Sequence, residues 1–145
     1  MGSGNLDELP GWADELLRAG RVGHLGLLDD RDRPRVLPVT YAVCGGRIYS
    51  TVDDKPKRVG GARVARVRFL RRRPEAALTV DRYDEDWSAL AWVQVLGSVV
   101  VLDDLDARPE GARALADKYP PYRRRAPAGP LLELVPERTL HWRAS

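Results

Sequence analysis

The sequence is poor in the residue types that small domains use for cross-links or for metal chemistry. Its 145 residues include one cysteine, Cys44, and two histidines, His24 and His141. A single cysteine excludes an internal disulfide and fits a reducing compartment, so a cytoplasmic location is expected. The two histidines are 117 positions apart, with no further histidine or cysteine at ligand spacing. We therefore predict no metal site.

Long apolar runs and the common catalytic motifs are also missing. No apolar run approaches the roughly 20 residues of a membrane span, and the first ten residues have no signal-peptide pattern, so no membrane partner is expected. The sequence has no glycine-rich nucleotide loop and no Gly-x-Ser-x-Gly turn. The lack of a self-contained catalytic constellation is typical of proteins that leave the chemistry to a cofactor.

Lysine is scarce, and arginine supplies most of the positive charge. The chain has 24 basic and 21 acidic residues, and its three lysines are Lys55, Lys57 and Lys118. Seven arginines lie between Arg58 and Arg73, and three more lie at 123–125. Such clusters bind phosphate-rich ligands or simply form a solvated face. Acidic segments are interspersed among them, so no nucleic-acid partner is expected.

The hydrophobic pattern predicts a mainly β (α+β) domain over residues 1–145, of which 1–5 are expected to be disordered or a cloning remnant. Alternating side chains along 90–102 put Trp92, Gln94 and the residues that follow them at this spacing on one face of a long strand. The glycines at 45–46 predict a hairpin turn. We expect about six antiparallel strands with flanking helices, closed into a small barrel. The expected strands are 22–28, 36–43, 48–52, 77–80, 90–102, 131–135 and 138–142. One helix is expected at the N-terminus, ending at Gly20, and two more over 61–72 and 108–118.

One loop has the composition of a phosphate site. Ser50 and Thr51 end a predicted strand, and Lys55 and Lys57 follow within seven residues. Hydroxyl groups provide directional hydrogen bonds and lysine provides a point charge, so the four side chains suit one phosphate group. A solvated basic loop is the alternative that this spacing leaves open.

Several segments resemble one known family. They are Arg33–Tyr41, Ile48–Lys57, Asp81–Trp87, Trp92–Gly97 and Lys118–Arg123 with Pro127–Pro130. The first two resemble the pyridoxamine-phosphate-oxidase-like flavin and deazaflavin binding family, and the others resemble its subgroup assigned to the deazaflavin coenzyme F420. This resemblance covers the chain from about Leu16 to Trp142. It implies a six-stranded antiparallel split β-barrel of the FMN-binding type and a homodimer with cofactor sites at the subunit interface.

The resemblance also implies roles for individual residues. Lys57 matches the lysine that meets the cofactor phosphate, with Lys55 beside it, and the hydroxyl groups noted above match those near that phosphate. The backbone of 37–40 matches the strand along the ring system, while Trp92 and Gln94 match a strand that faces the cofactor of one subunit or its partner. The implied cofactor-binding residues are Leu37, Pro38, Val39, Thr40, Ser50, Thr51, Lys55, Lys57, Trp92 and Gln94.

The implied activity is hydride transfer between F420 and a small electron-poor organic substrate. No residue needs to be a nucleophile, and Tyr41, Tyr83 or water is the candidate proton donor. The alternatives are an FMN-binding oxidase or reductase of the same fold, and a non-enzymatic cofactor- or haem-binding protein. The arginines of 58–73 favour F420, because its tail carries additional carboxylates.

Some positions depart from the family pattern. Asp32 replaces a glycine in the first turn, which is tolerable because aspartate can adopt a left-handed conformation. His24, Gly26 and Leu27 replace a more common Arg-Leu-Ala-Thr type of strand. Arg68 and Arg73 stand where asparagine is usual. These changes bear on the identity and affinity of the cofactor rather than on the fold.

Overall fold

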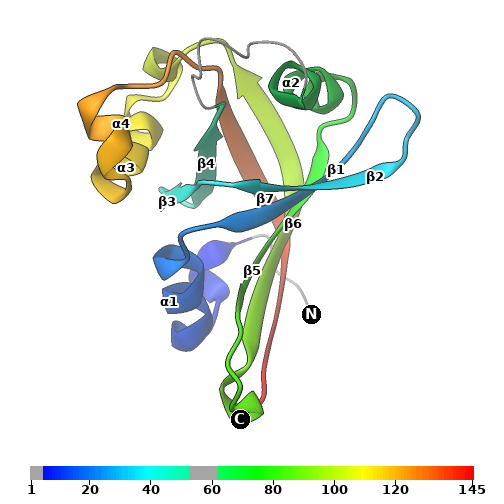
Figure 1. Cartoon of the computed structure of the whole chain (residues 1–145), viewed down its shortest axis with the longest axis vertical. Helices are drawn as coiled ribbons and strands as arrows, with labels where there is room; N and C mark the ends of the chain where they lie inside the picture. The colour runs from blue at the N-terminus through cyan, green and yellow to red at the C-terminus, as the bar shows by residue number, and fades with distance from the viewer. Residues whose placement is uncertain (1–4, 53–61) are drawn as a thin grey trace.

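The structure is a computed structural model that describes residues 5–52 and 62–145, without the side chains of 62–64. Its strands form one antiparallel sheet in the order β2-β1-β5-β6-β7-β4-β3, which curls into a half-barrel (Figure 1). The strands are β1 Gly23–Leu28, β2 Pro34–Val39, β3 Ala42–Cys44, β4 Arg47–Thr51, β5 Glu75–Arg82, β6 Ala91–Leu102 and β7 Leu131–Arg143. The helices are η1 Leu6–Glu8, α1 Gly11–Ala19, α2 Ala62–Arg72, η3 Trp87–Ala89, η4 Leu105–Ala107, α3 Pro109–Lys118 and α4 Pro120–Arg124.

The mainly β split-barrel prediction is confirmed, with seven strands in the sheet instead of six. The predicted strand 36–43 is divided at Thr40 and Tyr41. There the backbone N–H of Tyr41 donates to the Tyr119 hydroxyl, and the buried Tyr41 hydroxyl donates to the carbonyl of Leu17. These bonds direct the Tyr41 side chain into the core. The strand pairing is interrupted there, so the segment forms two strands, β2 and β3, instead of one.

The two strands predicted at the C-terminus are a single strand, β7, which pairs with β6 along its whole length. The pairing shifts between Leu96 and Gly97, where β7 contains one extra residue, a β-bulge. Gly97 is required at this point, because a Cβ there would lie 2.1 Å from the carbonyl oxygen of Val135. The bulge lets β7 bend and continue where the sequence pattern indicates a break.

Both predicted tight turns have the expected backbone. Gly45 and Gly46 have φ values of 58° and 75° between β3 and β4, in the left-handed region that hairpin turns require. Asp32 has a φ of 59° in the turn between β1 and β2, so the expectation that aspartate replaces glycine there is confirmed.

The main core lies inside the half-barrel. Leu25, Leu78 and Val95 point inward from three neighbouring strands and are almost completely buried. Leu17 of α1 and Leu70 of α2 join the same cluster from two separate helices. A fully buried aliphatic side chain of this size contributes about 1.5–3 kcal/mol, so closing the barrel with helices stabilises it substantially.

A second, smaller cluster covers the other side of the sheet at β3, β4 and β7. Leu115 and Tyr119, at the end of α3, pack there on Ala42, Tyr49 and Leu131. In Figure 1, α3 and α4 lie together beside β3, away from the long lower parts of β5, β6 and β7. Among the described residues, no helix is long and apolar enough to cross a membrane.

Candidate functional site

The sheet has one surface outside the barrel on β2, β1, β5 and β6, called the outer face below. Its composition follows from the register, since residues paired directly across two antiparallel strands point to the same side. The residues in register on this face include Val36 and Pro38 of β2, His24 and Gly26 of β1, Ala77, Thr79 and Asp81 of β5, and Trp92, Gln94 and Leu96 of β6. Val36 remains 67% exposed. The outer face is therefore a mainly apolar surface that includes β2 and β6, two of the strands with predicted cofactor-binding residues.

A short polar row crosses the middle of the outer face. His24 of β1 pairs with Thr79 of β5, and Thr79 pairs with Gln94 of β6. The Gln94 side-chain amide donates to the Thr79 hydroxyl over 3.0 Å. The hydroxyl accepts this bond and keeps its own hydrogen for another acceptor. Pro38 pairs with His24 on the other side, so the row ends at β2.

Beside this row the outer face is hollowed into a groove of about 420 Å³. Val36, Gly26, Ala77 and Leu96 lie across it on four neighbouring strands. The charged residues of its lining are Arg35, Glu75 and Glu137. This volume falls within the range of small-molecule sites.

Gly26 leaves bare backbone in this groove without being needed for the fold. A Cβ at Gly26 would lie 3.7 Å from the nearest atom, the carbonyl oxygen of Ala77, which is an ordinary contact. By contrast, a Cβ at Gly97 would collide with the chain at 2.1 Å. Glycine within a strand often marks a place where a ligand or another backbone approaches closely. Gly26 fits that explanation because packing within the chain does not demand it.

The backbone of β2 adds a second feature suited to a planar ligand. β2 is an edge strand of the sheet. An edge strand presents N–H and C=O groups on its open side, which can bind the polar rim of a ring. Leu37 and Val39 pair with inward residues of β1 and turn their side chains into the barrel, whereas Pro38 belongs to the outer face. β2 thus presents backbone N–H and C=O groups at its open edge and a flat apolar side chain, Pro38, on the outer face.

The two predicted cofactor residues of β6 lie where a ligand on the outer face would meet them. Trp92 and Gln94 are both half-buried, and Trp92 pairs with Asp81 on one side and Trp142 on the other. Trp142 is 45% exposed. The structure therefore brings Pro38, Trp92 and Gln94 onto one face, although two other strands, β1 and β5, separate β2 from β6.

The predicted phosphate hydroxyls are not brought together. Ser50 faces the barrel interior and donates to the carbonyl of Thr40 over 2.6 Å. Thr51 points to the opposite side of β4 and donates to the carbonyl of Pro130 over 3.1 Å. Successive side chains of a strand alternate in this way, so spacing alone overstates their convergence. Thr40 itself shares a 2.7 Å hydrogen bond with the Tyr122 hydroxyl. Lys55 and Lys57 lie outside the described residues.

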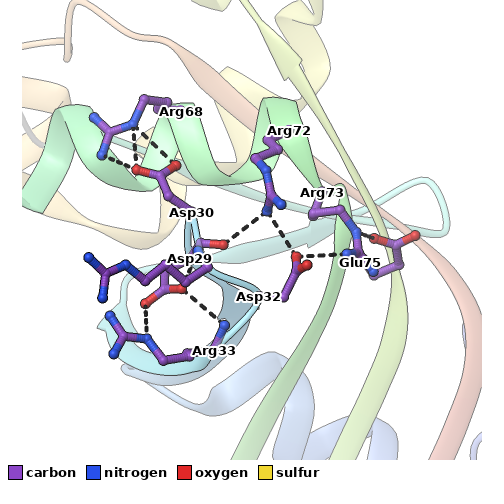
Figure 2. A network of polar contacts seen from close by, with 9 residues as sticks. Asp29, Asp30, Asp32, Arg33, Arg68, Arg72, Arg73 and Glu75 are labelled. Atoms are coloured by element: carbon purple, nitrogen blue, oxygen red, sulfur yellow. Dashed lines mark hydrogen bonds and ion pairs between the residues drawn. The ribbon is translucent and has the colours of Figure 1, made fainter.

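The arginine cluster of α2 is largely occupied by carboxylates of the chain itself. Figure 2 shows Arg68, Arg72 and Arg73 reaching from α2 and its end toward the turn between β1 and β2. Arg68 pairs with Asp30 at 2.9 Å, while Arg72 and Arg73 both contact Asp32, at 2.9 and 2.7 Å. The hydrogen bond from Arg72 holds the pKa of Asp32 below its usual value.

The neighbouring arginine of α2, Arg71, pairs with Asp103 at 2.9 Å. The four arginines at 68 and 71–73 therefore fasten α2 to adjacent turns. Exposed pairs of this kind contribute little each, typically below about 1 kcal/mol. Among the arginines proposed to meet an F420 tail, Arg58 and the side chain of Arg63 lie outside the described part, and Arg66 is half-buried.

Tyr41 is excluded as a proton donor. Its side chain is fully buried in the core, and burial raises the pKa of its hydroxyl well above the usual value. Its hydrogen bond to the carbonyl of Leu17 fixes that hydroxyl toward α1. Tyr83 is 63% exposed, and its hydroxyl accepts from the Trp87 indole N–H at 3.4 Å, within the loop that joins β5 to β6.

Sequence reasoning missed His24 and Thr79 as candidate site residues. The available signal was strand parity: His24 and Gly26 alternate with the buried Leu25 and Leu27, so they belong to the exposed face of β1. The register that places them beside Gln94 depends on pairing between strands about 55 residues apart in the chain, which no local pattern specifies.

Comparison with known proteins provides a family match over most of the chain. The sequence model described as pyridoxamine 5'-phosphate oxidase matches residues 12–139. No curated protein matches the sequence significantly.

Several solved structures share the fold at low sequence identity. A haem-binding protein from Mycobacterium smegmatis has a TM-score of 0.71 and 20% identity, over 92% of this chain and 55% of that one. An FAD-binding protein from Mesorhizobium loti has a TM-score of 0.67 and 19% identity, over 92% and 94%. An F420 reductase has a TM-score of 0.62 and 20% identity, over 92% and 98%.

Proposed function

This chain belongs to the pyridoxamine 5'-phosphate oxidase family, and we propose that it binds a flavin-type cofactor on its outer face and acts as an oxidoreductase. We further propose that the cofactor is F420, with FMN as the alternative. The observation that carries the proposal is the groove over Gly26, where the chain leaves bare backbone that its own packing does not require. Such a cofactor, when bound, supplies hydride transfer to an electron-poor organic substrate.

In this proposal the residues of the chain bind and orient the ring system. The open edge of β2 and the residue after it, from Leu37 to Thr40, provide backbone hydrogen bonds, and Pro38 and Val36 provide an apolar surface that excludes water. Gln94 contributes an amide at the polar row, oriented by its bond to Thr79. Holding a ring in one orientation against the substrate is the protein's contribution to the rate.

We propose that the phosphate is held by the loop after β4, with Lys57 as the principal cation and Lys55 beside it. Lys57→Ala is expected to weaken binding of either cofactor by about 1.5–3 kcal/mol, the range for a hydrogen bond to a charged group. The loss should shrink as salt increases, because screening already weakens the attraction in the parent. Isothermal titration calorimetry at two salt concentrations tests this. Equal affinities in parent and variant would remove Lys57 from the site.

The choice of F420 rests on arginines beyond the phosphate. We propose that the deazaflavin tail pairs with arginines of the 58–66 segment, whose guanidinium groups suit its additional carboxylates. The arginines at 68 and 71–73 pair with carboxylates of the chain. We expect the parent to bind F420 more tightly than FMN, and the double change Arg63→Gln with Arg66→Gln to narrow that difference. Arg71→Gln is the matched control. Tighter binding of FMN by the parent would instead support the FMN alternative.

A non-enzymatic haem-binding role is the second candidate, favoured by the exposed imidazole of His24 on the outer face and by likeness to a haem-binding structure. Absorption spectra of the protein mixed separately with haem, FMN and F420 distinguish the three. Flavin or F420 binding without a haem Soret shift supports the oxidoreductase proposal, and a shifted Soret band with no flavin binding contradicts it.

We also propose that the protein is a homodimer with the outer face at the interface. Val36, at 67% exposure, and Trp142, at 45%, leave apolar surface that a second copy would bury. Light scattering at micromolar concentration should give about twice 16.2 kDa. A monomer that nevertheless binds cofactor would separate the ligand site from the interface.

A further inference from the structure

We propose that His24 is the proton-bearing residue of the outer face: its protonated imidazole donates a hydrogen bond to the ring or substrate held beside β2, so that ligand binding takes up a proton there. This inference rests on the proposed function, which provides the ligand. It adds a residue that the family resemblance treats only as a departure from its pattern.

His24 lies where a ligand on the outer face would contact it. It is exposed on β1, between Pro38 on the strand proposed to carry the ring and Thr79 on β5. Cross-strand neighbours have Cβ atoms about 4.5–5.5 Å apart. A planar group that contacts Pro38 and Gln94 must therefore pass over the imidazole between them.

The chemistry of the neighbours carries the second step. Among the described residues in this row, Thr79 and Gln94 are neutral at every accessible pH, and Gln94 already spends one N–H on Thr79. Imidazole is the side chain that changes charge near neutral pH, and only its protonated form has a donor on both nitrogens. The carbonyl-rich edge of a flavin or deazaflavin ring provides the matching acceptors.

Among the described residues, few charged side chains lie next to His24 and could compete with a ligand for its imidazole. On β2 its outer-face neighbours are Pro38 and Val36, which are uncharged. On β5 Thr79 is flanked by Ala77 and Asp81, and on β1 the adjacent outer-face residue is Gly26. Asp81 is thus the carboxylate along these strands that lies diagonally to His24.

The two histidines of the chain form a built-in comparison. His141 lies on the opposite side of the sheet, where its ring packs edge-on against Trp12 with centroids 5.7 Å apart. A ligand on the outer face should therefore affect the imidazole of His24 and leave that of His141 unchanged.

The test is an NMR titration of both imidazoles from pH 5 to 9, with and without saturating FMN, and again with F420. The expected result is an upward move of the His24 titration midpoint on binding, with the His141 midpoint unchanged. Calorimetry then follows the dissociation constant at pH 6 and pH 8 for the parent, His24→Gln and His141→Gln. We expect binding in the parent to weaken about tenfold from pH 6 to pH 8, the size of one charge-assisted hydrogen bond, and the same in His141→Gln. His24→Gln should show a nearly constant affinity.

The outcomes separate this inference from the proposed function. Tight binding with no movement of the His24 midpoint, or a pH dependence that survives in His24→Gln, would overturn the role of His24 and leave the cofactor proposal standing. Failure of the parent to bind either cofactor at any pH would overturn both.

Discussion

A substitution that fills the groove at Gly26 should affect ligand binding and the stability of the fold in different ways. Gly26→Val places a branched side chain into the 420 Å³ groove. Within the chain its Cβ makes only ordinary contacts, 3.7 Å from the carbonyl oxygen of Ala77 and 4.0 Å from that of Arg35. Replacing an unneeded glycine stabilises a protein by about 0.4–1 kcal/mol through the unfolded chain. The melting temperature should therefore stay constant or rise by about 1–4 °C.

The same substitution should weaken cofactor binding. Forcing extra carbon atoms into a filled contact costs about 1–3 kcal/mol, which corresponds to roughly a 5- to 150-fold rise in the dissociation constant. Gly97→Ala is the matched control, because its Cβ would lie 2.1 Å from the carbonyl oxygen of Val135 and should destabilise the fold. Differential scanning fluorimetry and calorimetry with FMN and F420 measure both effects. Full-affinity binding by a well-folded Gly26→Val would refute placement of the ligand over Gly26.

Three further predictions concern residues away from the groove. Lys118 has its ammonium group 3.9 Å from the ring centre of Tyr41, and burial lowers the pKa of Lys118 to about 8. Because the unfolded chain then binds more protons than the folded one, the free energy of unfolding should rise between pH 8 and 9.5 in urea titrations. The rise should be absent in Lys118→Met. Tyr119→Phe leaves the N–H of Tyr41 without its acceptor and should cost about 1–3 kcal/mol in the same assay, and an unchanged midpoint would contradict this. Ser50→Ala removes the bond to the Thr40 carbonyl and should lower stability while leaving the dissociation constant for FMN unchanged; selective loss of binding would return Ser50 to the phosphate site.

Much of the fold was predictable because it depends on local patterns. The alternation along β6 correctly assigns Val93 and Val95 to the core and Trp92 and Gln94 to the other face. Likewise, glycines at 45–46 and Asp32 in the first turn specify left-handed backbone by their own chemistry. The division between β2 and β3 was not predictable, since it depends on bonds from Tyr41 to Leu17 and Tyr119, far away in sequence.

The candidate site was predictable only in part, for a related reason. Pro38 and Gln94 were identified from family resemblance, but the row that joins them through His24 and Thr79 exists only once three strands pair in register. The arginines of α2 gave the opposite error. As a sequence they look like a free cationic surface, but the turn between β1 and β2 supplies carboxylates such as Asp32 that pair with them.

The location of the ligand is the central claim, and amide hydrogen–deuterium exchange with and without bound cofactor tests it most directly. With saturating F420, and separately with FMN, we predict slower exchange along the open edge of β2 and in the segments of β1, β5 and β6 that contain His24, Gly26, Thr79 and Gln94. Exchange in α3 and β3, which lie on the helix-covered side, should not change. Protection confined to α3 and β3, or bound cofactor without protection of β2, would contradict the account.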